Sequence, residues 1–229
     1  MQTRRAFTLI ELLIVVAIIA ILAAIAVPNF LEAQVRSKIS RAQADMRTQS
    51  VAIEAYKVDR NRYPFGYLTV RQGGVAGNAT MGSLSAAERL EFSYQQITTP
   101  VAYLTQALRD PFTAGGCDFD RQGQQAAPNG FPYWYDDYMA WEGLFGSSNF
   151  GYHPSYTRML RIYQDGYTWS MSSAGPERKT MMMWFALNGV DPANAQGHIV
   201  FAYDPSNGTV SEGFVGRTNK GEFKEVNQP

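Results

Sequence analysis

The strongest pattern in this sequence is a long apolar segment close to the N-terminus. Residues 1–6 are polar and basic and include Arg4 and Arg5, whereas residues 7–27 are almost wholly apolar. As a helix, this segment would be about 31 Å long, roughly the thickness of the hydrocarbon core of a bilayer. Because the two arginines flank the segment on one side only, we expect a single-pass membrane protein with a cytoplasmic N-terminus.

The helical pattern continues beyond Pro28. Apolar residues recur at helical spacing on one face, and charged residues lie between them. The apolar positions are Leu31, Val35, Ile39, Ala42, Met46 and Ile53. Pro28 predicts a kink rather than a break, so residues 28–60 are an amphipathic continuation of the helix, which ends near Asp59. This apolar stripe would dock a globular domain.

Residues 61–229 read as that globular domain, with strands gathered in its second half. Ser85 and Glu88 form a capping-box pattern that opens a short helix through about Gln96. Residues 66–85 and 115–132 have the composition of loops. Residues 167–172 alternate as a strand, residues 199–203 are a second predicted strand, and Asn207-Gly208 is typical of a hairpin turn. A long helix followed by antiparallel strands predicts an α+β fold.

Aromatic residues are dense between positions 133 and 163. They could form a carbohydrate-stacking or adhesive surface, but core and subunit packing is the interpretation we favour. They are Tyr133, Trp134, Tyr135, Tyr138, Trp141, Phe145, Phe150, Tyr152, Tyr156 and Tyr163.

Composition narrows the function classes. Lys plus Arg and Asp plus Glu both number 20, so nothing in the bulk charge favours nucleic acid as the main partner. The single cysteine, Cys117, excludes an intramolecular disulfide and a multi-cysteine metal site, and the two histidines, His153 and His198, lie in no catalytic motif. We therefore expect no enzyme and no catalytic residues.

Glu11 is the one charged residue inside the apolar segment, and a carboxylate is costly within a membrane. Cleavage between Ala6 and Phe7 would expose an α-amino group at Phe7 that is mostly protonated at neutral pH. Glu11 of one subunit could then pair with Phe7 of a neighbour that is shifted along a helical stack. A misplaced subunit would leave one charge unpaired, so the pair would favour the correct register.

Three other interpretations of the segment remain. It could be a secretory signal cleaved at Ala24-Ile25-Ala26, a twin-arginine signal around Arg4 and Arg5, or a plain membrane anchor. None of the three explains Glu11.

Ala6-Phe7-Thr8-Leu9-Ile10-Glu11-Leu12 resembles the motif of type IV prepilins, which pilins share with type II secretion pseudopilins. The sequence departs from this motif at Ala6, where the family has Gly. The resemblance implies a leader peptide, residues 1–6, that a prepilin peptidase removes, and N-methylation of Phe7. It implies that residues 7–27 form both the transmembrane and the assembly helix, that Pro28 is the family's kink-forming proline, and that Glu11 acts in assembly.

A second resemblance favours the pseudopilin branch. The run from Thr98 to Leu104, followed by Asp110-Pro111-Phe112, is similar to a segment of secretion pseudopilins. It implies an inner-membrane subunit with a periplasmic or extracellular domain, polymerised into a helical pseudopilus that assists protein export. The implied partners are further copies of the chain, prepilin peptidase, an inner-membrane assembly platform, minor pseudopilins and membrane lipid.

Residues 167–179 resemble the pseudopilin stretch that precedes an acidic, calcium-binding run. Here Glu177 is followed by Arg178 and Lys179, which cannot supply the hard oxygen ligands that calcium requires. We expect no cofactor, with calcium at Asp118 and Asp120 or at Asp136 and Asp137 as the weaker alternative.

Two further functions stay open. The chain could be a type IV pilin of a surface fibre used for adhesion, motility or DNA uptake, or a membrane-anchored binding protein that never polymerises. Pairing of Glu11 predicts polymerisation.

Overall fold

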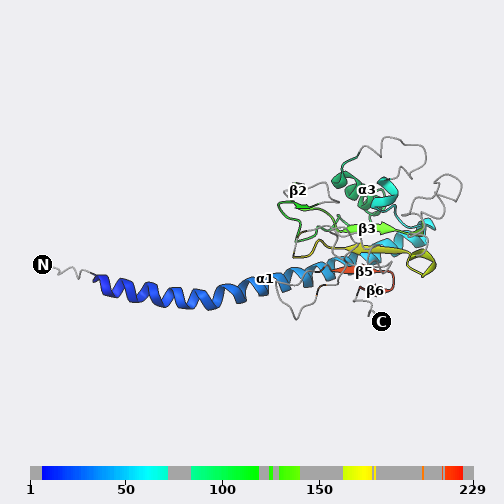
Figure 1. Cartoon of the computed structure of the whole chain (residues 1–229). Coiled ribbons are helices and arrows are strands. Elements are labelled where there is room, and N and C mark those ends of the chain that lie inside the picture. The colour runs from blue at the N-terminus through cyan, green and yellow to red at the C-terminus, as the bar shows by residue number, and fades with distance from the viewer. Residues whose placement is uncertain are drawn as a thin grey trace.

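The computed structural model describes residues 7–71, 84–118, 124–125, 129–139, 162–176, 178, 203, 213 and 215–223. Its dominant element is α1 (Leu9–Arg60), a single helix of 52 residues. The helix runs through Pro28 without a break and ends at Asn61, which adopts a left-handed φ of 53°. Figure 1 shows the N-terminal part of α1 projecting away from the rest of the molecule and its C-terminal part lying along the globular domain.

The main sheet has four antiparallel strands. They are β3 (Trp134–Asp137), β4 (Trp169–Ser172), β5 (Gly216–Thr218) and β6 (Gly221–Glu222), and they are hydrogen-bonded in that order. The register pairs Trp134 with Ser172 and Ser170 with Thr218. A long helix that precedes an antiparallel sheet confirms the predicted α+β fold.

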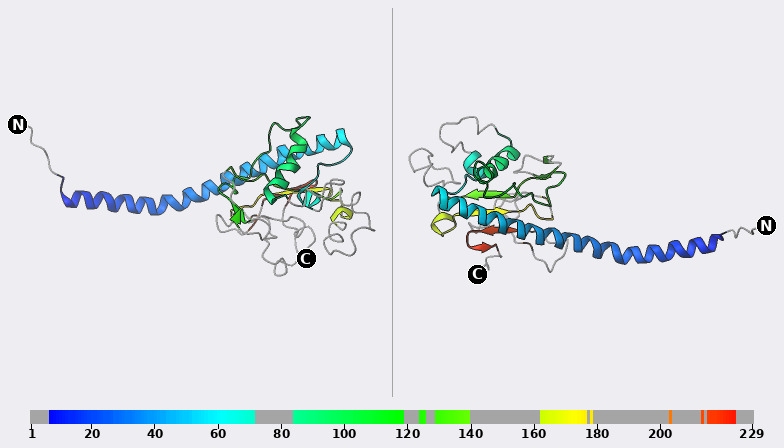
Figure 2. Two further views of the ribbon diagram at one scale, coloured as in Figure 1. Left: turned by 90° about the horizontal axis from the view of Figure 1, so that it is seen from above. Right: turned by 180° about the vertical axis from the view of Figure 1, so that it is seen from behind.

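Alternate residues of β3, at the edge of the sheet, and of its neighbour β4 face opposite layers. Tyr135, Trp169 and Met171 belong to the core cluster that contains Ile39, Met46 and Ile53 of α1. On β3, the intervening Trp134 belongs to a second cluster with Tyr67 and Leu90, which come from the two shorter helices. The side-chain period of two along a strand explains this division. Both sides of the sheet are therefore covered (Figure 2).

The first of these shorter helices, α2 (Tyr67–Arg71), lies in a segment that the sequence predicted to be a loop. That prediction was wrong because the start of α2 is fixed by side chains distant in the chain. Asp137 accepts hydrogen bonds from Gly66 N at 2.5 Å and from the Thr69 hydroxyl at 2.9 Å, and Asp136 accepts one from Leu68 N at 3.2 Å. A Cβ at position 66 would lie 2.5 Å from the backbone nitrogen of Asp137, so this close approach requires glycine.

The second short helix, α3 (Ala86–Thr98), begins where the sequence predicted it. Ser85 and Glu88 form the expected capping box, and Thr99 closes the other end through its N–H to Gln95 O at 2.9 Å. By contrast, the predicted loop 115–132 contains a short antiparallel pair, β1 (Cys117–Asp118) and β2 (Gln124–Gln125). Backbone pairing of two residues per strand leaves no hydrophobic alternation to detect.

Several predicted features can be compared with the structure. Ile39, Ala42, Met46 and Ile53 are buried as the stripe predicted, whereas Leu31 is exposed. The strand predicted at 167–172 is β4, but the strand at 199–203 and the turn at Asn207-Gly208 lie outside the described residues, apart from Tyr203. Four of the aromatic residues, Tyr133, Trp134, Tyr135 and Tyr138, are buried in the core, which is the interpretation we favoured for them. Residues 140–161 lie outside the described part.

Candidate assembly helix and domain-docking site

The first part of α1, residues 9–31, has every side chain exposed, and we call it the free arm. Its large apolar residues make no core contact with the described domain; Ile14, Ile18 and Leu22 are examples. Among the described residues, α1 is the one helix long and apolar enough to cross a membrane. This is compatible with a single-pass anchor, and none of the described core residues covers this apolar surface.

Glu11 takes part in capping the N-terminus of the free arm. Its Oε2 accepts hydrogen bonds from the Thr8 backbone N–H and from the Thr8 hydroxyl, both at 2.8 Å. Thr8 Oγ1 in turn accepts from Glu11 N at 3.3 Å, which completes a capping box. The sequence-based prediction gave Glu11 a partner in a neighbouring subunit only and missed this local partner, although Thr8-Leu9-Ile10-Glu11 has the spacing of a capping box.

The other residues assigned to processing and assembly also lie on this arm. Phe7 precedes α1 and is 72% exposed. Ala6 lies outside the described residues. Pro28 sits inside α1 near the end of the free arm, and the residue after it, Asn29, is helical. The structure thus places Phe7, Glu11 and Pro28 on one continuous segment.

The second part of α1, residues 39–60, packs on the domain, and we call it the docked segment. Polar side chains add to its apolar stripe. Asp45 accepts a hydrogen bond from the Tyr133 hydroxyl at 3.0 Å, and the Gln49 amide oxygen accepts one from the Tyr94 hydroxyl at 3.3 Å. Burial raises the pKa of both tyrosines well above the ordinary value, so their hydroxyls stay protonated and can donate.

Further along the docked segment, Glu54 and Asp59 make the same kind of contact. The Glu54 carboxylate accepts from Trp169 Nε1 at 2.7 Å and from the Tyr63 hydroxyl at 3.2 Å. Asp59 accepts from the Tyr103 hydroxyl at 2.8 Å. Four polar residues of α1 therefore meet aromatic donors of the domain, which fixes the rotation of the helix about its own axis. The sequence showed the aromatic residues but not these partners.

Two motifs that the sequence separated by about sixty residues meet beside this site. Asp110, from the Asp110-Pro111-Phe112 motif, accepts from the Ser173 hydroxyl at 2.9 Å and from Ala174 N at 2.6 Å, directly after β4. It also accepts from Phe112 N at 3.0 Å. Burial raises the pKa of Asp110 to about 6, although these hydrogen bonds lower it. Asp110 thus joins the loop after α3 to the end of the sheet.

Of the residues considered for calcium, Asp136 and Asp137 make other contacts, and Asp118 lies in β1. Asp137 and Asp136 cap α2, and Asp136 also accepts from Trp134 Nε1 at 2.6 Å. Asp120 and Glu177 are not among the described residues. In the described part of the chain, no three His, Cys, Asp or Glu residues lie close enough to hold a metal ion.

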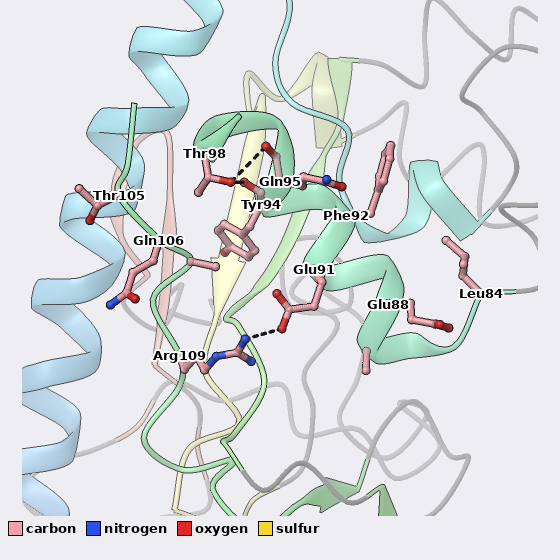
Figure 3. Close-up of a pocket in the computed structure, with 12 residues that line it drawn as sticks. Leu84, Glu88, Glu91, Phe92, Tyr94, Gln95, Thr98, Thr105, Gln106 and Arg109 are labelled. Atoms are coloured by element: carbon pink, nitrogen blue, oxygen red, sulfur yellow. Dashed lines mark hydrogen bonds and ion pairs between the residues drawn. The ribbon is translucent and has the colours of Figure 1, made fainter. Parts of the chain in front are cut away.

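A groove of about 600 Å³ runs between α3 and residues 105–109 (Figure 3). Glu91 of α3 and Arg109 face each other there and form an ion pair at 2.7 Å. The described residues that line the groove include no histidine or cysteine. The ion pair ties α3 to the segment that leads into Asp110.

These features define the class of protein. The N-terminal segment, residues 1–27, matches the family model of the prokaryotic N-terminal methylation motif. This match gives the chain a prepilin-type motif at its N-terminus, and the long apolar-then-amphipathic helix with the antiparallel sheet gives it an α+β fold like that of type IV pilins.

Comparison with characterised proteins finds relatives of two kinds. The chain is 29% identical over 150 residues to type II secretion system core protein G of Klebsiella pneumoniae, which covers 62% of this chain and 96% of that protein. It is 52% identical over 59 residues to the type IV major pilin protein PilA of Myxococcus xanthus, which covers 26% of this chain and 27% of that protein. The type IV wide pilus major component PilA4 of Thermus thermophilus is 46% identical over 63 residues, 28% of this chain and 48% of that protein. The chain thus spans less than half of each pilin but nearly all of core protein G. No solved structure gives a significant match.

Proposed function

We propose that this chain is a non-enzymatic fibre subunit, anchored in the bacterial inner membrane through the free arm and polymerised through the same arm. The exposed apolar surface of residues 9–31 is the observation that carries the proposal. Before assembly, lipid covers this surface, and in the fibre the free arms of neighbouring copies cover it. The docked segment holds the globular domain outside the membrane.

In this proposal, prepilin peptidase cleaves between Ala6 and Phe7 and methylates Phe7. The new Phe7 amine of one subunit then pairs with Glu11 of its neighbour. Thr8 has a role before assembly, because its N–H and its hydroxyl both donate hydrogen bonds to the Glu11 carboxylate of the same chain at 2.8 Å. This local capping lowers the cost of carrying a carboxylate in the apolar segment until a neighbour's amine arrives.

We further propose that the fibre is a type II secretion pseudopilus, in which a membrane ATPase drives the addition of subunits and the growing fibre assists protein export. The match to core protein G supports this branch. Because it extends over 150 residues and the chain up to the end of α1 has only 60, it must include part of the globular domain. The two pilin matches are short enough to lie within the N-terminal region.

A type IV pilin of a surface fibre is the second candidate, and the 52% identity to the Myxococcus pilin favours it. Deletion of the gene separates the two candidates. Loss of exported proteins from the medium, with surface fibres retained, supports the pseudopilin. Loss of surface fibres with secretion intact supports the pilin.

The assembly mechanism is tested by Glu11→Gln, which keeps the shape of the side chain and removes its charge. Cysteines placed at Ile14 and Val16 should cross-link neighbouring subunits of the parent protein into a ladder. We expect the ladder to be lost in Glu11→Gln, while membrane insertion and cleavage after Ala6, measured by N-terminal mass spectrometry, are retained.

Two controls define the result. Glu32→Gln neutralises another α1 carboxylate, one that pairs with Arg36 outside the apolar segment, and should leave the ladder unchanged. Thr8→Val removes the hydroxyl that caps Glu11 and should weaken the ladder less than Glu11→Gln. A normal ladder from Glu11→Gln would overturn the charge-pairing mechanism. A parent protein that begins at Met1 or beyond Val27 would overturn the whole proposal.

A further inference from the structure

Arg178 lies just beyond the end of β4 and donates hydrogen bonds to three main-chain carbonyl oxygens of one loop. Its Nε bonds to Phe112 O at 3.1 Å and its Nη2 bonds to Gly116 O at 3.0 Å. The same Nη2 also bonds to Ala114 O. The carbonyl groups of residues 112, 114 and 116 therefore converge on a single guanidinium, and we call residues 112–116 the carbonyl loop.

The backbone of the carbonyl loop produces this convergence. Gly115 and Gly116 have φ values of 83° and 110°, which L side chains rarely adopt. A turn from Gly116 N to Thr113 O at 2.9 Å tightens the loop. A Cβ on Gly115 would lie 3.5 Å from Arg178 Nη2, in ordinary van der Waals contact with the guanidinium.

Arg178 itself is held in an unusual conformation that presents its side chain to the loop. Its φ is 58°, a left-handed value that is uncommon for a residue other than glycine. Its backbone N–H bonds to Gly175 O at 3.0 Å in a turn that follows β4. The strain of this conformation is offset by charge-assisted hydrogen bonds, which are stronger than neutral ones.

Converging main-chain carbonyls are ligands of the kind that hard cations select. Here the chain fills the centre with its own cation. This arrangement does not fit calcium, because a metal ion at the carbonyls would have to displace the guanidinium. We propose that residues 112–116 form a cation cradle that Arg178 occupies, so that the loop is fastened to the segment after β4 without a metal ion.

Asp110 adds an independent observation. It joins the residue pair before the carbonyl loop to Ser173 and Ala174, because the Ser173 hydroxyl lies 2.9 Å from both carboxylate oxygens and Ala174 N donates to one of them at 2.6 Å. The same two segments are thus joined by a buried anion at one end and by a cation at the other. The proposal concerns the fold of the domain and holds whether or not the chain polymerises.

The test uses the full-length protein in detergent. Arg178→Gly removes the guanidinium, and glycine accepts a φ of 58° without strain, so any loss of stability comes from the side chain. Asn61→Gly is the matched control, because Asn61 is also a non-glycine residue with a positive φ, 53°, and lies far from the cradle in the sequence. We expect Arg178→Gly to lower the Tm by about 4–8 °C and Asn61→Gly to change it little.

Rescue distinguishes a cradle from ordinary packing. Millimolar guanidinium or methylguanidinium, far below denaturing concentrations, or millimolar Ca²⁺ should restore the Tm of Arg178→Gly and leave the parent protein unchanged. Arg178→Lys should retain part of the stability, because a single ammonium cannot reach all three carbonyls as a planar guanidinium does.

Three results would overturn the proposal: an Arg178→Gly protein as stable as Asn61→Gly, a loss of Tm that no added cation reverses, or a parent protein whose Tm falls in EDTA. If Arg178→Gly yields no folded protein, the proposal is tested instead by the Tm of Arg178→Lys and by the Tm of the parent protein in EDTA. A lysine variant with the full Tm of the parent would then contradict the role of the guanidinium fork.

Discussion

The free arm and the docked segment belong to one continuous helix but are built for different surroundings. Ile18 of the free arm is 53% exposed, whereas Ile53 of the docked segment is 1% exposed. The same side chain on the same helix is therefore covered by this chain in one place and left bare in the other. Folding of a single copy explains why Ile53 is buried. It does not cover Ile18, which lipid or neighbouring copies of the chain would have to cover.

Their polar residues differ in the same way. In the docked segment, Asp45, Gln49 and Glu54 reach across to aromatic donors of the domain. In the free arm, Glu11 turns back on Thr8, three residues earlier in the chain. Polar contacts of the docked segment thus fix a tertiary arrangement, whereas those of the free arm satisfy a charge locally and keep the arm independent of the domain.

The largest expected effect comes from breaking the apolar contact of the docked segment. Ile53→Ala should destabilise the domain by about 2–4 kcal/mol, because it removes a buried side chain and leaves a cavity between α1 and the sheet. Ile18→Ala, the same change in the free arm, should leave the free energy of unfolding of the domain nearly unchanged. Urea unfolding in detergent, followed by Trp fluorescence, measures both.

The opposite pattern is expected for assembly. Ile18→Ala should reduce cross-linking of neighbouring subunits more than Val51→Ala, which alters an exposed position of the docked segment, 68% exposed. Equal destabilisation of the domain by Ile18→Ala and Ile53→Ala would show that the two regions are not independent.

The sequence predicted the parts of this comparison that depend on periodicity. A period of 3.6 found the docked stripe from Ile39 onward, and the uninterrupted apolar run found the free arm. It did not predict α2, whose start is held by Asp136 and Asp137 about seventy residues later. Pairing between distant segments leaves no local pattern, and the partners of Glu54 and Asp110 were missed for the same reason.

The contacts of the candidate site also fall into those that a local sequence pattern can predict and those that it cannot. Four adjacent residues suffice to predict the Thr8–Glu11 capping box, yet the partner predicted for Glu11 was in a neighbouring subunit only. The contact between Asp110 and Ser173 could not be predicted, because a motif gives residue types and not the distance in space between two motifs. The contacts of Arg178 depend on backbone φ values at Gly115 and Gly116, which composition does not reveal.

An effect of pH should appear in the globular domain. Burial raises the pKa of Asp110 to about 6, and the nearby Asp45 adds to this shift. The folded protein therefore binds this proton more tightly than the unfolded chain, in which the pKa is about 3.9. The stabilising contribution is complete below about pH 4 and is lost as the pH rises to about 6, an effect of about 3 kcal/mol.

Asp110→Asn removes this titration, so the difference in unfolding free energy between parent and variant should vary between pH 4 and pH 6 and be constant above pH 7. Urea unfolding at a series of pH values provides the measurement. Because the variant also alters hydrogen bonds to Ser173 and Ala174, its absolute stability carries no information here and only the pH dependence counts. A difference that is flat from pH 4 to pH 7 would contradict the role of Asp110.

The smallest expected effect concerns the polar contacts of the docked segment. Glu54→Ala leaves Trp169 Nε1, buried in the core, without the acceptor that lies at 2.7 Å, and should cost about 1–2 kcal/mol. Glu54→Gln keeps an oxygen that can accept from Trp169, so it should retain most of the stability. The fluorescence of Trp169 in the folded state should change in Glu54→Ala and little in Glu54→Gln.

Glu32→Ala is the matched control, since it removes a carboxylate from an exposed ion pair with Arg36 and should have almost no effect. If Glu54→Ala behaves like Glu32→Ala, the apolar stripe alone holds the helix, and the rotation of α1 on the sheet is not fixed by its polar residues.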